Sequence, residues 1–263
     1  MCKISVIIPV LHNEQALVAR LSELQREPGV EVIVVDAGNR TQRQGFRESF
    51  VNVIWKTSRP GRGYQMNTGA KSASGEFLLF LHADTQLPKG WAECARHCLQ
   101  DPSVILGAFR FRPDQKGLGY RLLECGVWLR CTIHRMPYGD QALFVRMNDF
   151  RRIGGFRDWP LLEDIEWVER MKGHGRVVTL RQRVITSALR WKKSGILKRV
   201  RLNRSILREY RQGVPVAELS HRYRENKAAV IVFCKHPDPG KVKTRLAKTL
   251  GIQRAATIYK DIV

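Results

Sequence analysis

The feature that most constrains the fold is a regular alternation of apolar runs with helical segments over the first hundred residues. Residues 4–10, 30–36 and 51–55 are apolar runs rich in β-branched side chains, and residues 76–83 form a fourth run. Such runs are typical of strands buried on both faces. Helical spacing of apolar residues occupies the intervals 13–27, 62–73 and 89–100. The alternation predicts an α/β fold, Rossmann-like, with a mostly parallel sheet and helices on both faces.

The second half of the chain is less regular. We expect strands at 104–112 and 141–146, and helices at 118–134 and 162–173. The last of these helices places Leu162, Ile165, Val168 and Met171 on one face. Residues 190–225 are rich in Lys and Arg, and a new strand–loop–helix unit begins at Ala228. We therefore expect one domain over residues 1–225, with basic helices at its end, and the truncated start of a second domain over residues 226–263.

The charge of the chain indicates its partners. Forty-six Lys and Arg residues against 24 Asp and Glu give a net charge of +22, and such a surface attracts phosphates on nucleotides, nucleic acids or anionic lipids. No apolar run approaches the ~20 residues of a membrane span, and no signal-peptide pattern opens the chain. We expect a cytoplasmic protein. Cys94, His97 and Cys98 lie within about one helical turn and could bind a metal, although buried helix cysteines are the simpler interpretation.

Two carboxylates in this basic chain follow strands directly. Asp36 ends the second expected strand and Asp84 follows the fourth. Ligands of open α/β sheets bind at the carboxyl ends of the strands, so these two residues predict a ligand site, with capping of a helix N-terminus as the alternative. Residues 9–14, PVLHNE, replace the glycine-rich loop of dinucleotide folds, and no Walker loop occurs, which disfavours NAD and FAD.

The order of the motifs resembles the family 2 glycosyltransferases, which have the GT-A fold. The resemblance begins with the segments SVIIPVLHNE, EVIVVDAGNRT and GRGYQMNTGAKSASGEFLLFLHADT. It continues with YGDQALFVRMNDFRRIGGF, WPLLEDIEW and the pair Arg190–Trp191, and it covers roughly residues 3–191. His-Ala-Asp at residues 82–84 is similar to a subgroup associated with radical-SAM and selenoprotein gene neighbourhoods and linked to arsenosugar biosynthesis.

The resemblance implies a role for each matching residue. One set of residues would contact the base and ribose of a nucleotide-sugar donor, and a second set would contact the acceptor. Asp84 would hold Mg²⁺ or Mn²⁺ on the donor diphosphate. Asp164 would be the catalytic base, with Glu163 supporting it. The donor set is Pro9, Glu14, Asp36, Arg62, Asn67 and His82, and the acceptor set is Gly139, Asp140, Gln141, Arg190 and Trp191.

The chemistry of sugar transfer is consistent with these roles. A diphosphate leaving group develops charge, which a hard divalent cation with oxygen ligands stabilises. An acceptor hydroxyl needs a base to take its proton, and a single base acting opposite the leaving group inverts the anomeric carbon. The family's usual Asp-X-Asp is here His82-Ala83-Asp84. His82 could be a nitrogen ligand, bond the ribose or make an ordinary contact at the strand end. Asp164 and Glu163 lie near the N-terminus of their helix, where we expect the helix dipole to keep both carboxylates ionised. Capping of this helix is the alternative role for both.

Three further expectations concern the basic end of the chain. The stretch 194–213 predicts an amphipathic helix, with Ile196, Leu197, Val200, Leu207 and Tyr210 as its apolar stripe. This helix would dock on the inner face of an anionic membrane or on a lipid-linked acceptor. The alternative is that its apolar stripe packs on the catalytic domain. Residues 232–247 resemble the start of sugar-nucleotide or phospholactate-type nucleotidyltransferases, which leaves that activity as an alternative. A nucleic-acid-binding protein is the other alternative, although no known motif of that class occurs and we expect no nucleic-acid partner.

Overall fold

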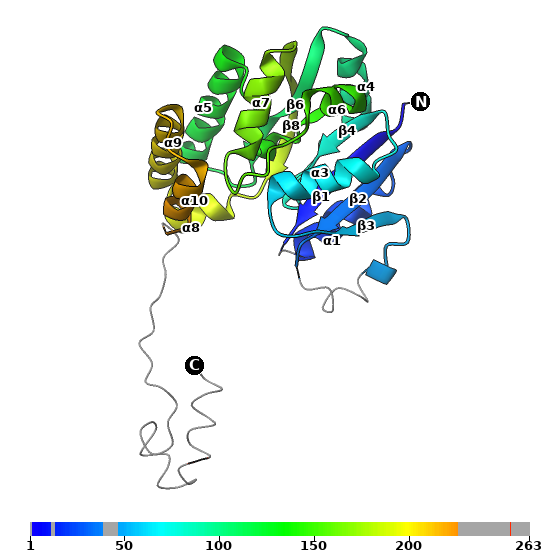
Figure 1. The fold of residues 1–263 in the computed structure, drawn as a ribbon, viewed down its shortest axis with the longest axis horizontal. Helices are drawn as coiled ribbons and strands as arrows, with labels where there is room; N and C mark the ends of the chain where they lie inside the picture. The colour runs from blue at the N-terminus through cyan, green and yellow to red at the C-terminus, as the bar shows by residue number, and fades with distance from the viewer. Residues whose placement is uncertain (1, 12–13, 39–46, 226–252, 254–263) are drawn as a thin grey trace. The chain divides into compact units, whose positions relative to one another are not determined.

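The computed structural model describes residues 2–11, 14–38, 47–225 and 253. The chain divides into two compact units, Met1–Tyr223 and Arg224–Val263. The nucleotidyltransferase-like segment 226–263, apart from Gln253, lies outside the described residues, and its function and the domain boundary at 225 stay predictions. The first unit carries the elements described below (Figure 1).

Eight strands of the described residues form one sheet in the order β3-β2-β1-β4-β7-β6-β8-β5. The pairs β1–β2, β2–β3, β1–β4 and β6–β8 are parallel, whereas β4–β7, β6–β7 and β5–β8 are antiparallel. The strands are β1 (Ile4–Val10), β2 (Val30–Asp36), β3 (Val53–Thr57), β4 (Phe77–Phe80), β5 (Thr85–Gln86), β6 (Val104–Pro113), β7 (Phe144–Arg146) and β8 (Arg176–Thr186). The predicted α/β fold with a mostly parallel sheet is confirmed.

Helices cover both faces of this sheet, because the strands alternate their side chains between two cores. Ile7, Ile33 and Leu78 belong to the core that Met66 and Val168 share. Val6, Val34 and Leu79 belong to the opposite core, against α1 and α4. The helices are α1 (Glu14–Leu24), α3 (Arg62–Ser72), α4 (Trp91–Gln100), α5 (Leu118–His134), α6 (Met147–Ile153), α7 (Glu163–Lys172), α8 (Leu189–Ser194), α9 (Ile196–Arg211) and α10 (Val216–Glu225), with a 3₁₀ turn, η2, at Gly139–Gln141.

An aromatic cluster fixes α7 on the sheet. Trp167 is fully buried, and its ring lies 4.3 Å from Phe156, 5.6 Å from Phe80 and 5.7 Å from Phe150, measured between centroids. Burying an aromatic side chain stabilises a fold by about 1.5–3 kcal/mol. Because Trp167 lies one turn after Glu163 and Asp164, this packing sets where both carboxylates lie.

The elements that sequence patterns did not predict include β8, β5 and α6. The sequence of β8, RVVTLRQRVIT, carries three arginines and alternates imperfectly, and several of its residues are exposed. Among the described strands its outer neighbour is β5, which has two residues. Because a strand near the edge of a sheet is partly exposed to water, it does not require the continuous apolar run that is typical of β1 and β2.

The predicted amphipathic helix in the basic stretch is present as α9, but its apolar stripe faces mostly inward. Leu207 and Tyr210 pack against the core of the first unit, Ile206 beside them is buried, and Leu197 is 73% exposed. The side chain of Ile196 reaches α5, 3.0 Å from where a Cβ on Gly119 would lie. The stripe predicted for membrane docking therefore serves largely to attach α9 to the rest of the first unit.

Helix α5, which lies beside α9 (Figure 1), has an exposed apolar face. Leu118, Leu122, Leu129 and Ile133 are between 49% and 77% exposed, and Cys125 lies exposed among them. Spacings of four, three, four and four residues place these side chains in one line along the helix. No helix of the described residues is long and apolar enough to cross a membrane.

Candidate functional site

The carboxyl ends of β1, β2 and β4 meet at one edge of the sheet. Pro9 lies near the end of β1, beyond the residues Ile4–Ile7 that pair with β4. The amide proton that proline lacks is therefore not needed for a backbone hydrogen bond to β4. Gln65 of α3, a residue that the sequence analysis did not single out, is buried and donates to the carbonyls of Val10 and Val35 at 2.9 and 2.8 Å. It ties the ends of β1 and β2 together.

Asp36 ends β2 as predicted, but its carboxylate is almost fully buried. It accepts the backbone amide of Gly38 at 2.8 Å and the guanidinium of Arg47 at 3.0 Å. Arg47 lies 5.3 Å over the ring of Trp55. Asp36 is thus held by Gly38 and Arg47, and its predicted role in ligand binding stays a prediction, as does the capping alternative.

Two residues predicted beside the nucleotide lie on α3 and meet the segment before α7. The side chain of Arg62, 44% exposed, lies 3.8 Å from the Glu163 carboxylate. Asn67 donates to the carbonyl of Phe156 at 2.7 Å and accepts its amide at 3.0 Å. Both ends of this amide are therefore engaged in holding α3 against the segment that contains Phe156, and the predicted place of Asn67 beside the nucleotide stays a prediction.

Asp164 lies where η2, α7 and the end of β4 converge. Its Oδ2 accepts the amide of Gly139 at 2.7 Å, and its Oδ1 accepts that of Ile165 at 2.9 Å. A Cβ at Gly139 would lie 3.1 Å from Asp164 Oδ2 and 3.3 Å from His82 Nε2. The structure thus brings together three residues that are far apart in sequence, and Gly139 has no side chain to block the space between the carboxylate and the imidazole.

Glu163 is buried beside Asp164, and its electrostatics differ from the expectation. Burial and, after it, the charge of Asp164 raise the pKa of Glu163 from 4.5 to about 7, with Arg62 opposing the shift. The sequence analysis expected the helix dipole to keep both carboxylates ionised. Because Glu163 has left water almost completely, the cost of burying its charge exceeds the favourable effect of the helix N-terminus, and the expectation is wrong for this residue.

Asp140 and Gln141, which were predicted on the acceptor side, form η2 with Gly139. Gln141 is completely buried; its amide donates to the carbonyl of Phe109 at 2.9 Å and accepts from Arg130 at 3.0 Å and from the amide of Tyr138 at 3.1 Å. Gln141 therefore shapes this side by anchoring η2 from within the protein. The carbonyl of Asp140 accepts the hydroxyl of Thr186 at 3.1 Å.

Asp84 is the candidate metal ligand. Its side chain is half-buried, and within the described part of the chain no hydrogen bond or ion pair engages its carboxylate, while its carbonyl accepts the amide of Ser187. No group of three His, Cys, Asp or Glu residues within that part could hold an ion by itself. A single available carboxylate at a strand end fits one protein ligand of a divalent ion whose other ligands are donor phosphates and water.

The segment after β8 lies next to Asp84, although sequence separates them by a hundred residues. Thr85 and Thr186 share a hydrogen bond between hydroxyls at 3.2 Å, and Asp114 accepts the amide of Ala188 at 2.9 Å. These contacts begin α8, which carries Arg190 and the half-buried Trp191. The side chains of Arg190 and Glu14 lie outside what the structure describes, so their predicted roles stay predictions.

Comparison with known proteins agrees with this geometry. Residues 5–157 match the family described as glycosyl transferase family 2. The pre-mycofactocin glycosyltransferases of two Mycobacterium tuberculosis strains are 28% identical over 174 residues, which cover 58% of this chain and 35% of theirs. The chain thus spans about a third of the length of these relatives.

Two crystal structures of S. aureus TarS are similar in fold. The structure of TarS residues 1–349 superposes with a TM-score of 0.56 at 18% identity, covering 71% of this chain and 60% of that one. The second gives 0.53 at 15% identity, covering 76% and 39%. Because the family match covers more than half of the chain and the fold is that of GT-A enzymes, this chain belongs to glycosyltransferase family 2.

Proposed function

We propose that the chain is an inverting glycosyltransferase that moves a sugar from a nucleotide-diphosphate sugar to an acceptor hydroxyl, with Asp164 as the general base. The observation that carries the proposal is the convergence of Asp164, Gly139 and His82 at the carboxyl edge of the sheet. The two backbone amides that Asp164 accepts hold its carboxylate in place. Its catalytic use then depends on how it is positioned against the acceptor hydroxyl.

The donor diphosphate would be bound through Mg²⁺ or Mn²⁺ on Asp84. When bound, the ion would neutralise the charge that develops on the leaving diphosphate. Arg62, which is half exposed near Glu163, would contact a donor phosphate. His82 would bond the donor, and Pro9 and Asp36 would line or order its nucleotide pocket. The narrower resemblance, to the subgroup linked to radical-SAM and selenoprotein neighbourhoods, rests on the triplet at residues 82–84 and is part of the proposal.

Membrane contact at a cytoplasmic surface also belongs to the proposal, and α5 supports it better than α9. The exposed line Leu118, Leu122, Leu129 and Ile133 is flanked by exposed Arg121 and Arg135 in a chain of net charge +22. A second copy of so basic a chain would be repelled, whereas anionic lipid complements both the apolar line and the charge.

Vesicle sedimentation tests this surface. Leu122→Ser with Leu129→Ser should reduce binding to anionic vesicles at least fivefold. Val51→Ser, at a still more exposed apolar site away from α5, should change it little. Equal binding of the wild type to neutral vesicles, or concentration-dependent dimerisation that the double variant abolishes, would contradict a lipid-facing α5.

A panel of UDP-, GDP- and dTDP-sugars with and without Mn²⁺ tests the transfer proposal. A ligand at 100 times its Kd stabilises the native state by about 2.7 kcal/mol, so the true donor should raise the Tm in a metal-dependent manner. Slow release of the sugar to water should follow the same donor. A chain that binds oligonucleotides at 150 mM salt but no nucleotide sugar would favour the nucleic-acid alternative instead.

A further inference from the structure

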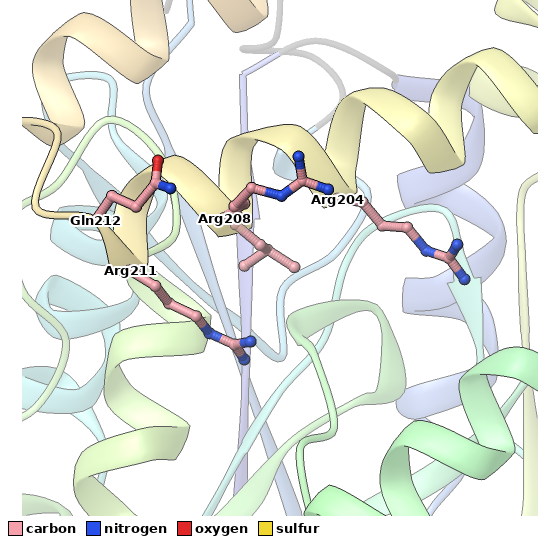
Figure 2. Close-up of a pocket in the computed structure, with 5 residues that line it drawn as sticks. Arg204, Arg208, Arg211 and Gln212 are labelled. Carbon is pink, nitrogen blue, oxygen red and sulfur yellow. The ribbon is translucent and has the colours of Figure 1, made fainter.

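Arg130 of α5 differs from the arginines of the basic helix α9 in what its guanidinium group contacts. Arg204, Arg208 and Arg211 of α9 are exposed, and their guanidinium groups lie apart from one another (Figure 2). The side chain of Arg130 is half-buried, and its guanidinium group donates to oxygen atoms of the protein. An arginine that is engaged in this way fixes local structure, because its planar group holds several acceptors in one geometry.

The guanidinium group of Arg130 contacts the segment between α5 and β7 at three places. Its Nε donates to the carbonyl of Met136 at 2.9 Å, and its Nη2 donates to Oε1 of Gln141 at 3.0 Å. Its Cζ lies 3.4 Å from the centroid of the Tyr138 ring, within the range of a cation–π contact. One side chain therefore holds the beginning, the middle and the end of residues 136–141.

The segment that Arg130 holds lies between two residues with unfavourable backbone conformations. Arg135 has a φ of 52° and Ala142 a φ of 49°, and Leu162, directly before Glu163, has a φ of 63°. Residues with a Cβ adopt positive φ at a cost in free energy, and they persist there only where the surrounding structure enforces it. Because its three contacts lie between Arg135 and Ala142, Arg130 supplies part of that enforcement.

The same segment carries the amide that binds the proposed base. Gly139 donates to Oδ2 of Asp164 at 2.7 Å. Gln141, which accepts from Arg130, donates to the carbonyl of Phe109 in β6 at 2.9 Å and so fixes η2 on the sheet. The connection from Arg130 to Asp164 thus passes through the side chain of Gln141, the turn η2 and the amide of Gly139. A shift of η2 would displace the amide that holds the carboxylate.

We propose that Arg130 is a positioning residue for Asp164, which it holds in place for proton abstraction through Gln141 and Gly139. The proposal rests on the proposed transfer function, in which Asp164 is the general base. A displacement of about 1 Å in a catalytic group can lower a rate about 10²-fold. The nucleotide-sugar donor binds elsewhere in the proposed site, at Asp84 and Arg62, so the loss of Arg130 affects turnover and not donor affinity.

Steady-state release of the sugar to water, with the donor that the nucleotide-sugar panel identifies, tests this separation. In Arg130→Met, kcat should fall about 10–100-fold, while KM for the donor should change less than about twofold. Arg130→Lys keeps the charge but not the planar group, and should lower kcat only about threefold. If Arg130→Met does not fold, the loss in Arg130→Lys decides. Unchanged kcat in the folded variants overturns the proposal.

Arg96→Met is the matched control for a purely structural role. Arg96 of α4 also donates to two backbone carbonyls, those of Cys2 at 2.9 Å and Pro28 at 3.1 Å, which precede β1 and β2. Both substitutions should therefore lower the Tm, but Arg96→Met should keep the wild-type kcat. An equal fall in kcat in the two variants would show that turnover follows stability alone, and would refute the positioning role.

Amide hydrogen exchange of Gly139 gives a measurement that needs no activity. It can be followed by NMR on protein labelled at its glycines, with Gly69 of α3 as the internal reference. In Arg130→Met the amide of Gly139 should exchange about tenfold faster or more, while that of Gly69 stays close to the wild-type rate. Equal acceleration at both glycines, or none at Gly139, contradicts the proposal.

A double variant separates the possible failures. In the Asp164→Asn background, Arg130→Met should lower turnover no further, because the base that it positions is already absent. A second loss of the same size would show that Arg130 acts elsewhere, and the proposal would be wrong. If no nucleotide sugar binds to any of these proteins, the transfer function itself is refuted. The exchange rate of Gly139 would then still decide whether Arg130 holds the contact with Asp164.

Discussion

Replacing Glu163 by Gln should stabilise the protein at pH 8 and not at pH 4. The pKa of Glu163 is raised by burial from 4.5 to about 7, so the folded state holds a proton that the unfolded state releases between these two values. Stability is therefore complete below about pH 4.5 and falls as the pH rises to about 7. A shift of this size corresponds to about 3 kcal/mol at pH 8.

The neutral amide avoids this cost, but it also gives up the ion pair with Arg62. That pair is 3.8 Å long and its arginine is 44% exposed, so its loss offsets less than about 1 kcal/mol. The net gain of about 2 kcal/mol should raise the Tm at pH 8 by roughly 4–8 °C.

Differential scanning calorimetry from pH 4 to pH 8 measures this gain, with Glu169→Gln, an exposed position on the same helix, as the control. The difference in Tm between the variant and the wild type should grow as the pH rises. An equal gain at pH 4 and pH 8, or a loss at both, would show that burial does not raise the pKa of Glu163.

Three other predictions concern single carboxylates. Asp164→Asn should keep donor affinity while transfer falls by about 10²–10⁴-fold; wild-type turnover, or parallel loss of donor binding, would remove its assignment as base. Asp84→Asn should weaken metal-dependent UDP or GDP binding tenfold or more, about 1.4 kcal/mol, and an affinity that EDTA does not change would exclude a metal role. Burial opposes ionisation of Glu31, but hydrogen bonds from Lys3, Ser5 and Ser74 lower its pKa to about 2. Its contribution is present above about pH 4.5 and is lost as the pH falls to about 2, so Glu31→Gln should lower the Tm at pH 7 by a few degrees and leave it unchanged near pH 2.

The sequence by itself determined the α/β fold and most of its elements. Buried parallel strands must be apolar along their whole length, so β1 and β2 are visible in the printed sequence. The helical spacing of Leu162, Ile165, Val168 and Met171 likewise predicted the buried face of α7. The apolar runs placed Asp36 at the end of β2, as the structure has it, whereas β4 ends at Phe80 and Asp84 lies in the turn before β5.

Only the tertiary structure decided what these side chains touch. Gly139 and Asp164 are 25 residues apart, and no periodicity predicts that an amide of one binds the carboxylate of the other at 2.7 Å. The raised pKa of Glu163 likewise depends on how completely the packing around Trp167 removes it from water. The stripe of α9 has the pattern of a membrane-facing helix, yet Leu207 and Tyr210 lie on the core, because an amphipathic pattern shows that a helix buries one face but not what covers that face.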